Sequence, residues 1–120
     1  MPSKHDPAAC LEDILSNIDR IEGYITGVDQ STFTANTMLR DAVERCLERV
    51  CEAAHRLGDR GLELMPSQPW RNIRGVGNWL RHAYDQINPD VLWNAVCDDL
   101  PVLRRDAQVA LESLGGITSL

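Results

Sequence analysis

The sequence predicts an all-α protein, an antiparallel up-and-down bundle of four main helices with short extra turns. Apolar residues recur at steps of three and four through most of the chain, as they do on the buried face of a helix. No stretch of useful length alternates apolar and polar residues in the manner of a half-buried strand. The links between the helical stretches are short, and short links join antiparallel neighbours.

The first helix begins at Asp6-Pro7, because Asp can cap a helix and Pro is favoured at its first position. Its apolar stripe continues to about Thr26, and Gly27 is a suitable stop. The polar segment 28–36, which holds Phe33, is predicted to be a loop or a short helical turn.

The second helix begins near Thr37, and Gly58 ends it. Residues 59–65 can add a short turn with leucines facing inward. The segment 65–69 is the clearest break in the chain, because it holds two prolines in four residues.

The third helix is expected from about Pro69 to Tyr84 or Asp85. Gly75 and Gly77 lie inside it, and each weakens a helix by roughly 1 kcal/mol relative to Ala. Two such residues in one helix indicate close packing of another backbone, or a kink.

The fourth helix restarts at Asn88-Pro89, with Asn as cap, and stops at Gly115-Gly116. Pro101 lies inside it and is expected to kink it near Cys97, since proline removes one hydrogen-bond donor.

Length and charge narrow the class of protein. A chain of 120 residues is expected to form a single helical domain, 1–120. The net charge of -6 argues against a general nucleic-acid coat and against a binder of anionic membranes, which need basic surfaces. Without an apolar run of membrane-spanning length or a signal-peptide pattern, the expected location is the cytoplasm.

Cysteines and histidines give no metal-site pattern. The four cysteines form no Cys-x-x-Cys pair, so they are interpreted as reduced thiols that act as small buried apolar groups. The three histidines, His5, His55 and His82, do not lie at the spacing from each other or from the cysteines that metal ligands need. We therefore expect neither a metal nor another cofactor.

The third helix carries the candidate site. No acidic residue occurs from Leu64 to Tyr84, although the chain has 18. At helical spacing, four polar residues of this segment share one face: Arg71, Arg74, Asn78 and His82. Arg81 adds a further positive charge. Such a surface attracts a negatively charged ligand.

These residue types suit cleavage of a phosphodiester without a metal. Histidine can act as general acid or base, and arginine can hold phosphate oxygens and stabilise charge in the transition state. Asn78 can orient the ring or bind a phosphate oxygen, and Tyr84 adds a hydroxyl. Taken singly, each residue is also compatible with an ordinary surface or packing role, so spacing alone leaves the function open.

Several blocks of the chain together resemble the HepT-like proteins of the HEPN superfamily, over about residues 10–114. The blocks are Asp41-Ala42-Val43, Glu52-Ala53-Ala54, Pro69-Trp70-Arg71, Asn78 to Tyr84, Asp90-Val91-Leu92-Trp93 and Asp99-Leu100-Pro101. The resemblance implies a HEPN-type helical bundle that dimerises. It also implies a metal-independent ribonuclease, the toxin of a bacterial toxin–antitoxin pair, whose partner is an MntA-like minimal nucleotidyltransferase.

The family signature places an Arg four to six residues before a His, with a Tyr two positions after it. His82 matches the signature histidine, Tyr84 the tyrosine that the partner adenylylates, and Asn78 the polar residue after the arginine. The arginine position itself holds Gly77. Arg74 or Arg81 can substitute as phosphate clamp, and Arg71, Arg74 and Arg81 are the candidate RNA-binding residues.

Two functions are therefore carried forward. One is a ribonuclease toxin that acts on RNA as a homodimer, in which two copies of the third helix line one cleft. The alternative is a non-catalytic nucleotide- or RNA-binding partner subunit of a minimal nucleotidyltransferase.

Overall fold

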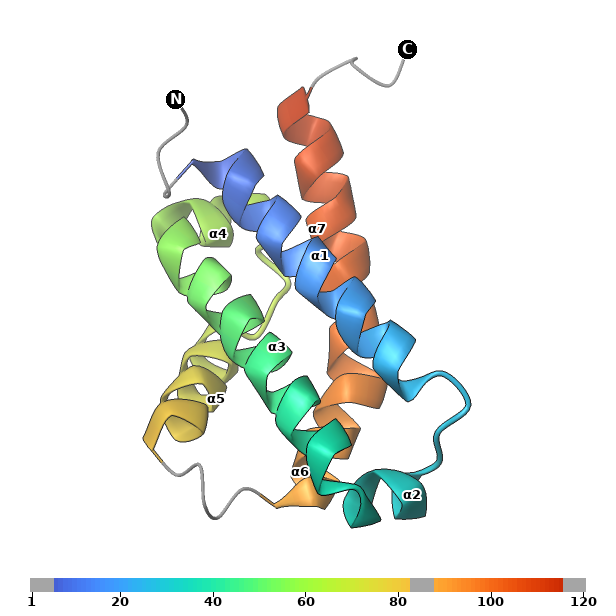
Figure 1. Cartoon of the computed structure of the whole chain (residues 1–120). Coiled ribbons are helices and arrows are strands. Elements are labelled where there is room, and N and C mark those ends of the chain that lie inside the picture. Colours follow the sequence, from blue (N-terminus) through green and yellow to red (C-terminus); the bar gives the residue numbers. More distant parts are fainter. Residues whose placement is uncertain (1–5, 83–87, 116–120) are drawn as a thin grey trace.

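Every regular element of the described chain is a helix, which confirms the predicted fold class. The computed structural model describes residues 6–82 and 88–115. Four main helices alternate in direction, the last one being built from three consecutive pieces (Figure 1). The elements are α1 (Pro7–Ile25), α2 (Gln30–Ala35), α3 (Thr37–Leu57), α4 (Asp59–Leu64), α5 (Trp70–His82), α6 (Pro89–Asn94), the π-helical segment η1 (Ala95–Asp99) and α7 (Leu100–Gly115).

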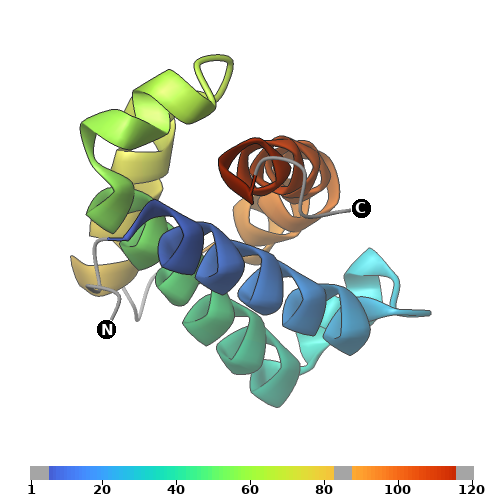
Figure 2. The ribbon, with the colours of Figure 1, turned by 90° about the horizontal axis from the view of Figure 1, so that it is seen from above.

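Helix α1 lies between α3 and α7 and packs against both (Figure 2). Ile14, Ile18 and Ile21 on α1 are completely buried. Burying an isoleucine side chain contributes roughly 1.5–3 kcal/mol. The apolar stripe of α1 therefore forms the centre of the core, and α3 and α7 cover it on two sides.

Capping residues fix the helix boundaries close to where the sequence predicts them. The Asp6 carboxylate accepts a hydrogen bond from the Ala9 amide at 3.1 Å, and Asn88 accepts one from the Asp90 amide at 2.8 Å. Gly58 ends α3 with a φ of 57°, in the left-handed region that glycine adopts at low cost. The segment predicted as a loop or short turn contains the six-residue helix α2.

At Pro101 the fourth predicted helix contains a π-helical segment in place of a simple kink. Its ring cannot donate a hydrogen bond to the carbonyl of Cys97, so one α-helical bond is missing there. The chain forms the π-helical segment η1 just before it, in which the Leu100 amide donates to the carbonyl of Ala95. The irregularity therefore includes Cys97, as predicted, but it takes the form of a wider helical turn.

Three cysteines match their predicted role and one does not. Cys10, Cys46 and Cys51 are buried free thiols, whereas Cys97 in η1 is exposed. The wide turn places Cys97 on the outer side, away from the core.

Helix α5 is held differently from α1. It packs mainly against α3 and lies at the side of the bundle (Figure 1). The link before it is anchored by two hydrogen bonds, from Trp70 Nε1 to the carbonyl of Met65 at 2.9 Å and from Gln68 Nε2 to Asp106 at 2.6 Å. These contacts set where α5 begins and leave much of its surface free.

No helix within the described residues is long and apolar enough to span a membrane.

Candidate functional site

Gly77 brings α5 into close contact with α3. A Cβ atom built on Gly77 would lie 3.2 Å from the Cβ atom of Cys51 on α3, closer than most real Cβ contacts. The residue is buried, so its small size lets the two helices approach. Gly75, by contrast, has nothing within 4 Å of such a Cβ atom. Of these two glycines, therefore, only Gly77 packs closely against another helix.

The contact between Gly77 and Cys51 also aligns the two helices. Because α3 and α5 run in opposite directions, residues after Cys51 lie beside residues before Gly77 (Figure 1). His55, one turn after Cys51, is thereby placed at the level of Ile73 and Arg74.

A hollow of about 270 Å³ opens at this level between α3, α4 and α5. We call it the α3–α5 hollow. Gly77, Trp70 and Ile73 form part of its lining. Its polar and outer lining includes His55, Asp59, Leu62, Arg74, Asn78 and Arg81.

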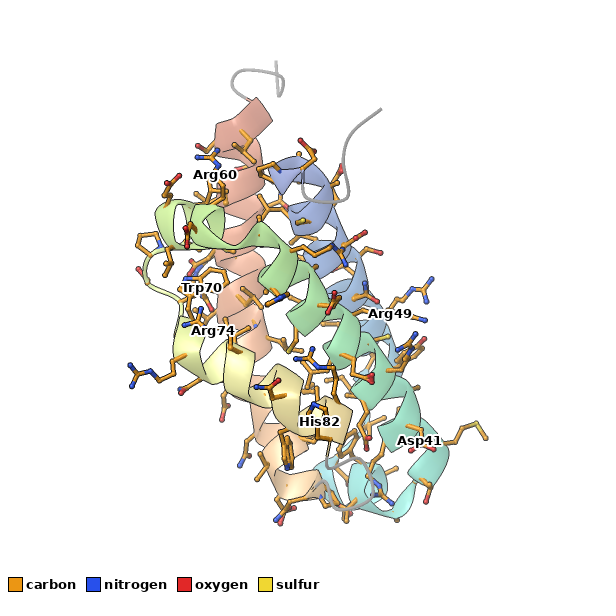
Figure 3. All side chains as sticks on the ribbon, turned by 90° about the vertical axis from the view of Figure 1, so that its left-hand side faces the viewer. Asp41, Arg49, Arg60, Trp70, Arg74 and His82 are labelled. Carbon is orange, nitrogen blue, oxygen red and sulfur yellow. The ribbon has the colours of Figure 1, made fainter. Side chains whose placement is uncertain are left out.

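Three of the predicted site residues meet in this hollow. Arg74, Asn78 and Arg81 line it, whereas Arg71 and His82 are exposed and are not among its lining residues. Figure 3 shows Trp70 and Arg74 in the first half of α5 and His82 at its end. The predicted common face of α5 is therefore divided between the hollow and the open surface. Tyr84 lies outside the described residues.

Among the three arginines of α5, Arg81 is the one whose side chain is held by other side chains. Its Nη2 atom donates to Oδ1 of Asn78 at 2.8 Å, and its Nη1 atom lies 3.8 Å from a carboxylate oxygen of Glu52. The same Nη1 atom would lie 3.8 Å from a Cβ atom on Gly77. The guanidinium of Arg81 thus folds back over Gly77.

A second hollow, of about 440 Å³, lies on the other side of Arg81 and between α1, α3 and α5. Gly77 and Arg81 line both hollows, so the two hollows adjoin at these residues. The second hollow mixes charges, and several of them are paired: Arg56 contacts Asp13 at 2.8 Å and Arg45 contacts Glu48 at 3.4 Å. Its charged lining comprises Asp13, Arg45, Glu48, Arg49, Glu52, Arg56 and Arg81.

The thiol of Cys51 is not suited to act as a nucleophile. Burial raises its pKa to about 11, the Arg81 guanidinium lowers it slightly, and Glu48 raises it further. A thiol with such a pKa is protonated near neutral pH, and only the thiolate is reactive.

Sequence reasoning missed His55 as a member of this cluster. It comes from α3, and only the alignment set by Gly77 and Cys51 brings it beside Arg74. The one hint in the sequence is the glycine itself, which indicates a close approach without saying to which residue. Within the described part of the chain, no three His, Cys, Asp or Glu side chains are grouped so that they could hold a metal ion.

Comparison with known proteins gives a consistent result over nearly the whole chain. A model of the Ribonuclease HepT-like family matches residues 14–110. "Putative RNase MJ1380" of Methanocaldococcus jannaschii is 33% identical over 107 residues, 89% of this chain and 98% of its own length. "Probable ribonuclease HepT" of Thermococcus cleftensis is 33% identical over 94 residues, 78% of this chain and 86% of its own. No solved structure gives a significant match.

Proposed function

Because this chain belongs to the ribonuclease HepT-like family, we propose that it is an endoribonuclease that cleaves RNA without a metal ion. One observation carries the proposal: α5 presents an exposed imidazole, that of His82, next to a guanidinium fixed by an amide. Arg81 follows Leu80 and precedes His82, and it is hydrogen-bonded to Asn78. The names of the relatives, which describe RNases, support the same reaction class.

In the proposed reaction, the 2′-hydroxyl of RNA attacks the adjacent phosphorus. His82 takes the proton of that hydroxyl as general base. The bond from phosphorus to the 5′-oxygen breaks, a cyclic phosphate forms, and the leaving oxygen takes up a proton from water or from a protonated imidazole. Arg81 holds phosphate oxygens and stabilises the negative charge that builds up on them, while Asn78 keeps Arg81 in place.

The proposed active form is a homodimer. Helix α5 packs mainly against α3, and Arg71 and His82 are exposed outside the α3–α5 hollow. In a two-fold dimer the same patch meets itself, so two copies of α5 would line one electropositive cleft. This concentration of charge would attract RNA despite the acidic chain.

We further propose that the protein is the toxin of a toxin–antitoxin pair. Its antitoxin would be an MntA-like nucleotidyltransferase that attaches adenylyl groups to Tyr84, two positions after His82. An added adenylyl group carries negative charge, so it would repel RNA phosphates from the neighbouring arginines.

A second candidate function is binding of RNA or nucleotide without cleavage. The observation that favours it is the tight packing at Gly77, where any side chain requires Cys51 on α3 to shift by a few tenths of an ångström. In this alternative the cationic surface is retained, but one contact to the transition state is lost. Such a loss typically reduces the rate about a hundredfold or more.

The first experiment measures cleavage of a model RNA in the presence of a metal chelator. Substitution His82→Ala is expected to reduce the rate by about 100-fold to 10,000-fold, as loss of a general base does. Because His82 is exposed, the circular dichroism spectrum should not change. Equal rates for wild type and variant would reject His82 as catalytic residue.

The second experiment separates the two candidate functions. Gly77→Arg adds a guanidinium, and Gly77→Ala is the matched control because it adds the same Cβ atom without the charge. If the wild type is inactive and only Gly77→Arg gains cleavage, the non-catalytic function is correct. Cleavage by the wild type contradicts it.

The third experiment tests the modification. After incubation with an MntA-like nucleotidyltransferase and ATP, the intact mass should rise by whole adenylyl units in the wild type and not in Tyr84→Phe. An unchanged mass, with an enzyme shown to be active on another substrate, would contradict the proposed role of Tyr84.

A further inference from the structure

His55 and Arg74 face the same hollow from two different helices, and the proposed reaction uses His55 nowhere. Both line the α3–α5 hollow together with Asn78 and Arg81. Neither the His55 nor the Arg74 side chain has an ion-pair or hydrogen-bond partner among the described residues. Their donors are therefore available to a ligand.

The balance of charge in this hollow favours an anion. Arg74 and Arg81 carry positive charges, His55 adds a donor that can also become positive, and Asp59 is the one carboxylate among the lining residues. In the neighbouring mixed-charge hollow, acidic partners already bind two arginines. An anion would thus bind beside Arg74 in preference to the other hollow.

The position of the hollow relative to His82 sets what it can bind. His55 lies four residues past Cys51, and His82 lies five residues past Gly77 in the opposite direction. At about 1.5 Å per residue the two histidines are about 13 Å apart along the helix axes. Side chains lean about one position toward the helix start, which shortens this to about 10 Å.

One phosphate cannot contact both histidines. Two hydrogen bonds of about 3 Å that meet on one oxygen span about 6 Å at most. A strand that follows α5 would therefore present one phosphate near His82 and a different one at the α3–α5 hollow.

From these observations we infer that the α3–α5 hollow is a second phosphodiester subsite, in which His55 and Arg74 bind a backbone phosphate of RNA away from the one that is cleaved. The inference rests on the proposed function, since it assumes RNA as the substrate. Asn78 fixes Arg81 from within the hollow. Leu62 and Ile73 give the adjoining ribose an apolar wall. Asp59 weakens the site by repulsion.

The subsite is tested by binding, which does not depend on cleavage. The probe is a fluorescent 2′-O-methyl RNA oligonucleotide of six residues, which lacks the attacking hydroxyl, in chelator-containing buffer. Arg74→Gln should weaken its affinity about tenfold, because it removes one charge-assisted hydrogen bond. It should also reduce the slope of log K against log salt by about 0.7. His55→Gln should weaken binding less.

Two variants provide controls of opposite kinds. Arg105→Gln removes a charge from an exposed position on α7 and should change the affinity less than twofold. Asp59→Asn removes the opposing carboxylate and should tighten binding about twofold to threefold. A loss of affinity in Asp59→Asn, or unchanged affinity in both Arg74→Gln and His55→Gln, would overturn the subsite.

Two further arms separate this proposal from others. Uridine 5′-monophosphate should compete only weakly with the oligonucleotide, because it offers a single phosphate. If it instead binds as tightly as the oligonucleotide, and Arg74→Gln weakens its binding, then the hollow binds a free nucleotide. That result would show that the RNA subsite is wrong. Absence of cleavage with Arg74-dependent binding rejects only the ribonuclease. Cleavage that depends on His82, with binding that ignores Arg74 and His55, rejects only the subsite.

Discussion

Helices α1 and α5 differ in what their residues contribute. In α1, six residues of 19 are buried, and the apolar side chains repeat without interruption. In α5, three residues of 13 are buried, one of them a glycine, while its charged side chains are exposed. Helix α1 contacts both α3 and α7, whereas α5 is held mainly by α3.

The difference separates stability from chemistry. Burial of apolar area is the main favourable term in folding, so α1 and its neighbours carry most of the stability. Exposed charged groups contribute little to stability but can bind an anion. Substitutions in α1 should therefore have a large effect on the free energy of unfolding and a small effect on RNA. Substitutions in α5 should have a large effect on RNA binding or cleavage and a small effect on stability.

The strongest test of this division compares two isoleucines. Ile18 of α1 is completely buried, and Ile73 of α5 is only partly buried. We expect Ile18→Ala to reduce the free energy of unfolding by about 2–5 kcal/mol, from lost burial and from the cavity that remains. Ile73→Ala should cost less than half as much in the same urea titration.

Both variants also need an RNA-binding measurement under conditions in which they are folded. Ile18→Ala should bind the oligonucleotide like the wild type, because it does not touch the hollow. Equal losses of stability in the two variants would show that α5 belongs to the core as fully as α1 does.

The contact between the two regions gives a pH prediction. Burial raises the pKa of the Cys51 thiol to about 11 in the folded protein, against about 8.5 in an unfolded chain. Below about pH 8.5 the thiol is protonated in both states and contributes no pH dependence. Between about pH 8.5 and 11 the unfolded state loses its proton first, so stability should fall by about 2 to 3 kcal/mol.

Cys51→Ala provides the matched measurement, since it keeps the Cβ atom that packs on Gly77. Urea titrations at several pH values under reducing conditions should show a shallower decline for this variant above pH 8.5. Identical declines in both proteins would mean that the thiol is solvated and that α5 does not seal it.

Trp70, which anchors the start of α5, should be sensitive to a larger residue at Gly61. A Cβ atom on Gly61 in α4 would lie 2.6 Å from Cη2 of Trp70, whose ring nitrogen holds the link before α5. Gly61→Ala is expected to destabilise the protein by about 1–3 kcal/mol through this clash. Gly23→Ala in α1 is the control, because its Cβ atom meets nothing within 4 Å and should stabilise by up to about 1 kcal/mol. Thermal unfolding that shows no difference between the two alanine variants would argue against a fixed Trp70.

Periodicity predicted the scaffold well because its signal is repeated many times. The stripe of α1 and the caps at Asp6 and Asn88 each point to the same boundary, and the structure agrees with them. Residue patterns did not predict the π-helical form of η1. The sequence marks a defect at Pro101, but the way the helix accommodates it depends on how the turn packs.

The candidate site was predicted only in part, for a different reason. The cationic character of α5 can be predicted from its own residues. The division of its polar face between the α3–α5 hollow and the open surface cannot. Arg74 and Arg81 turn toward His55 because Gly77 fits against Cys51, and this is a tertiary contact between residues 26 positions apart. No spacing rule within α5 contains that information.

The smallest expected effect on stability comes from removing an exposed ion pair in either region. Arg104 on α7 contacts Asp19 on α1 at 2.8 Å, and Arg81 on α5 lies 3.8 Å from Glu52 on α3. Both pairs are exposed, so Arg104→Gln and Arg81→Gln should each change the free energy of unfolding by less than about 1 kcal/mol, and less still in high salt. The two variants should differ in RNA binding, where only Arg81→Gln weakens the complex, because only Arg81 lines the α3–α5 hollow. If Arg104→Gln weakened RNA binding equally, the affinity would come from total charge, and the division between scaffold and site would fail.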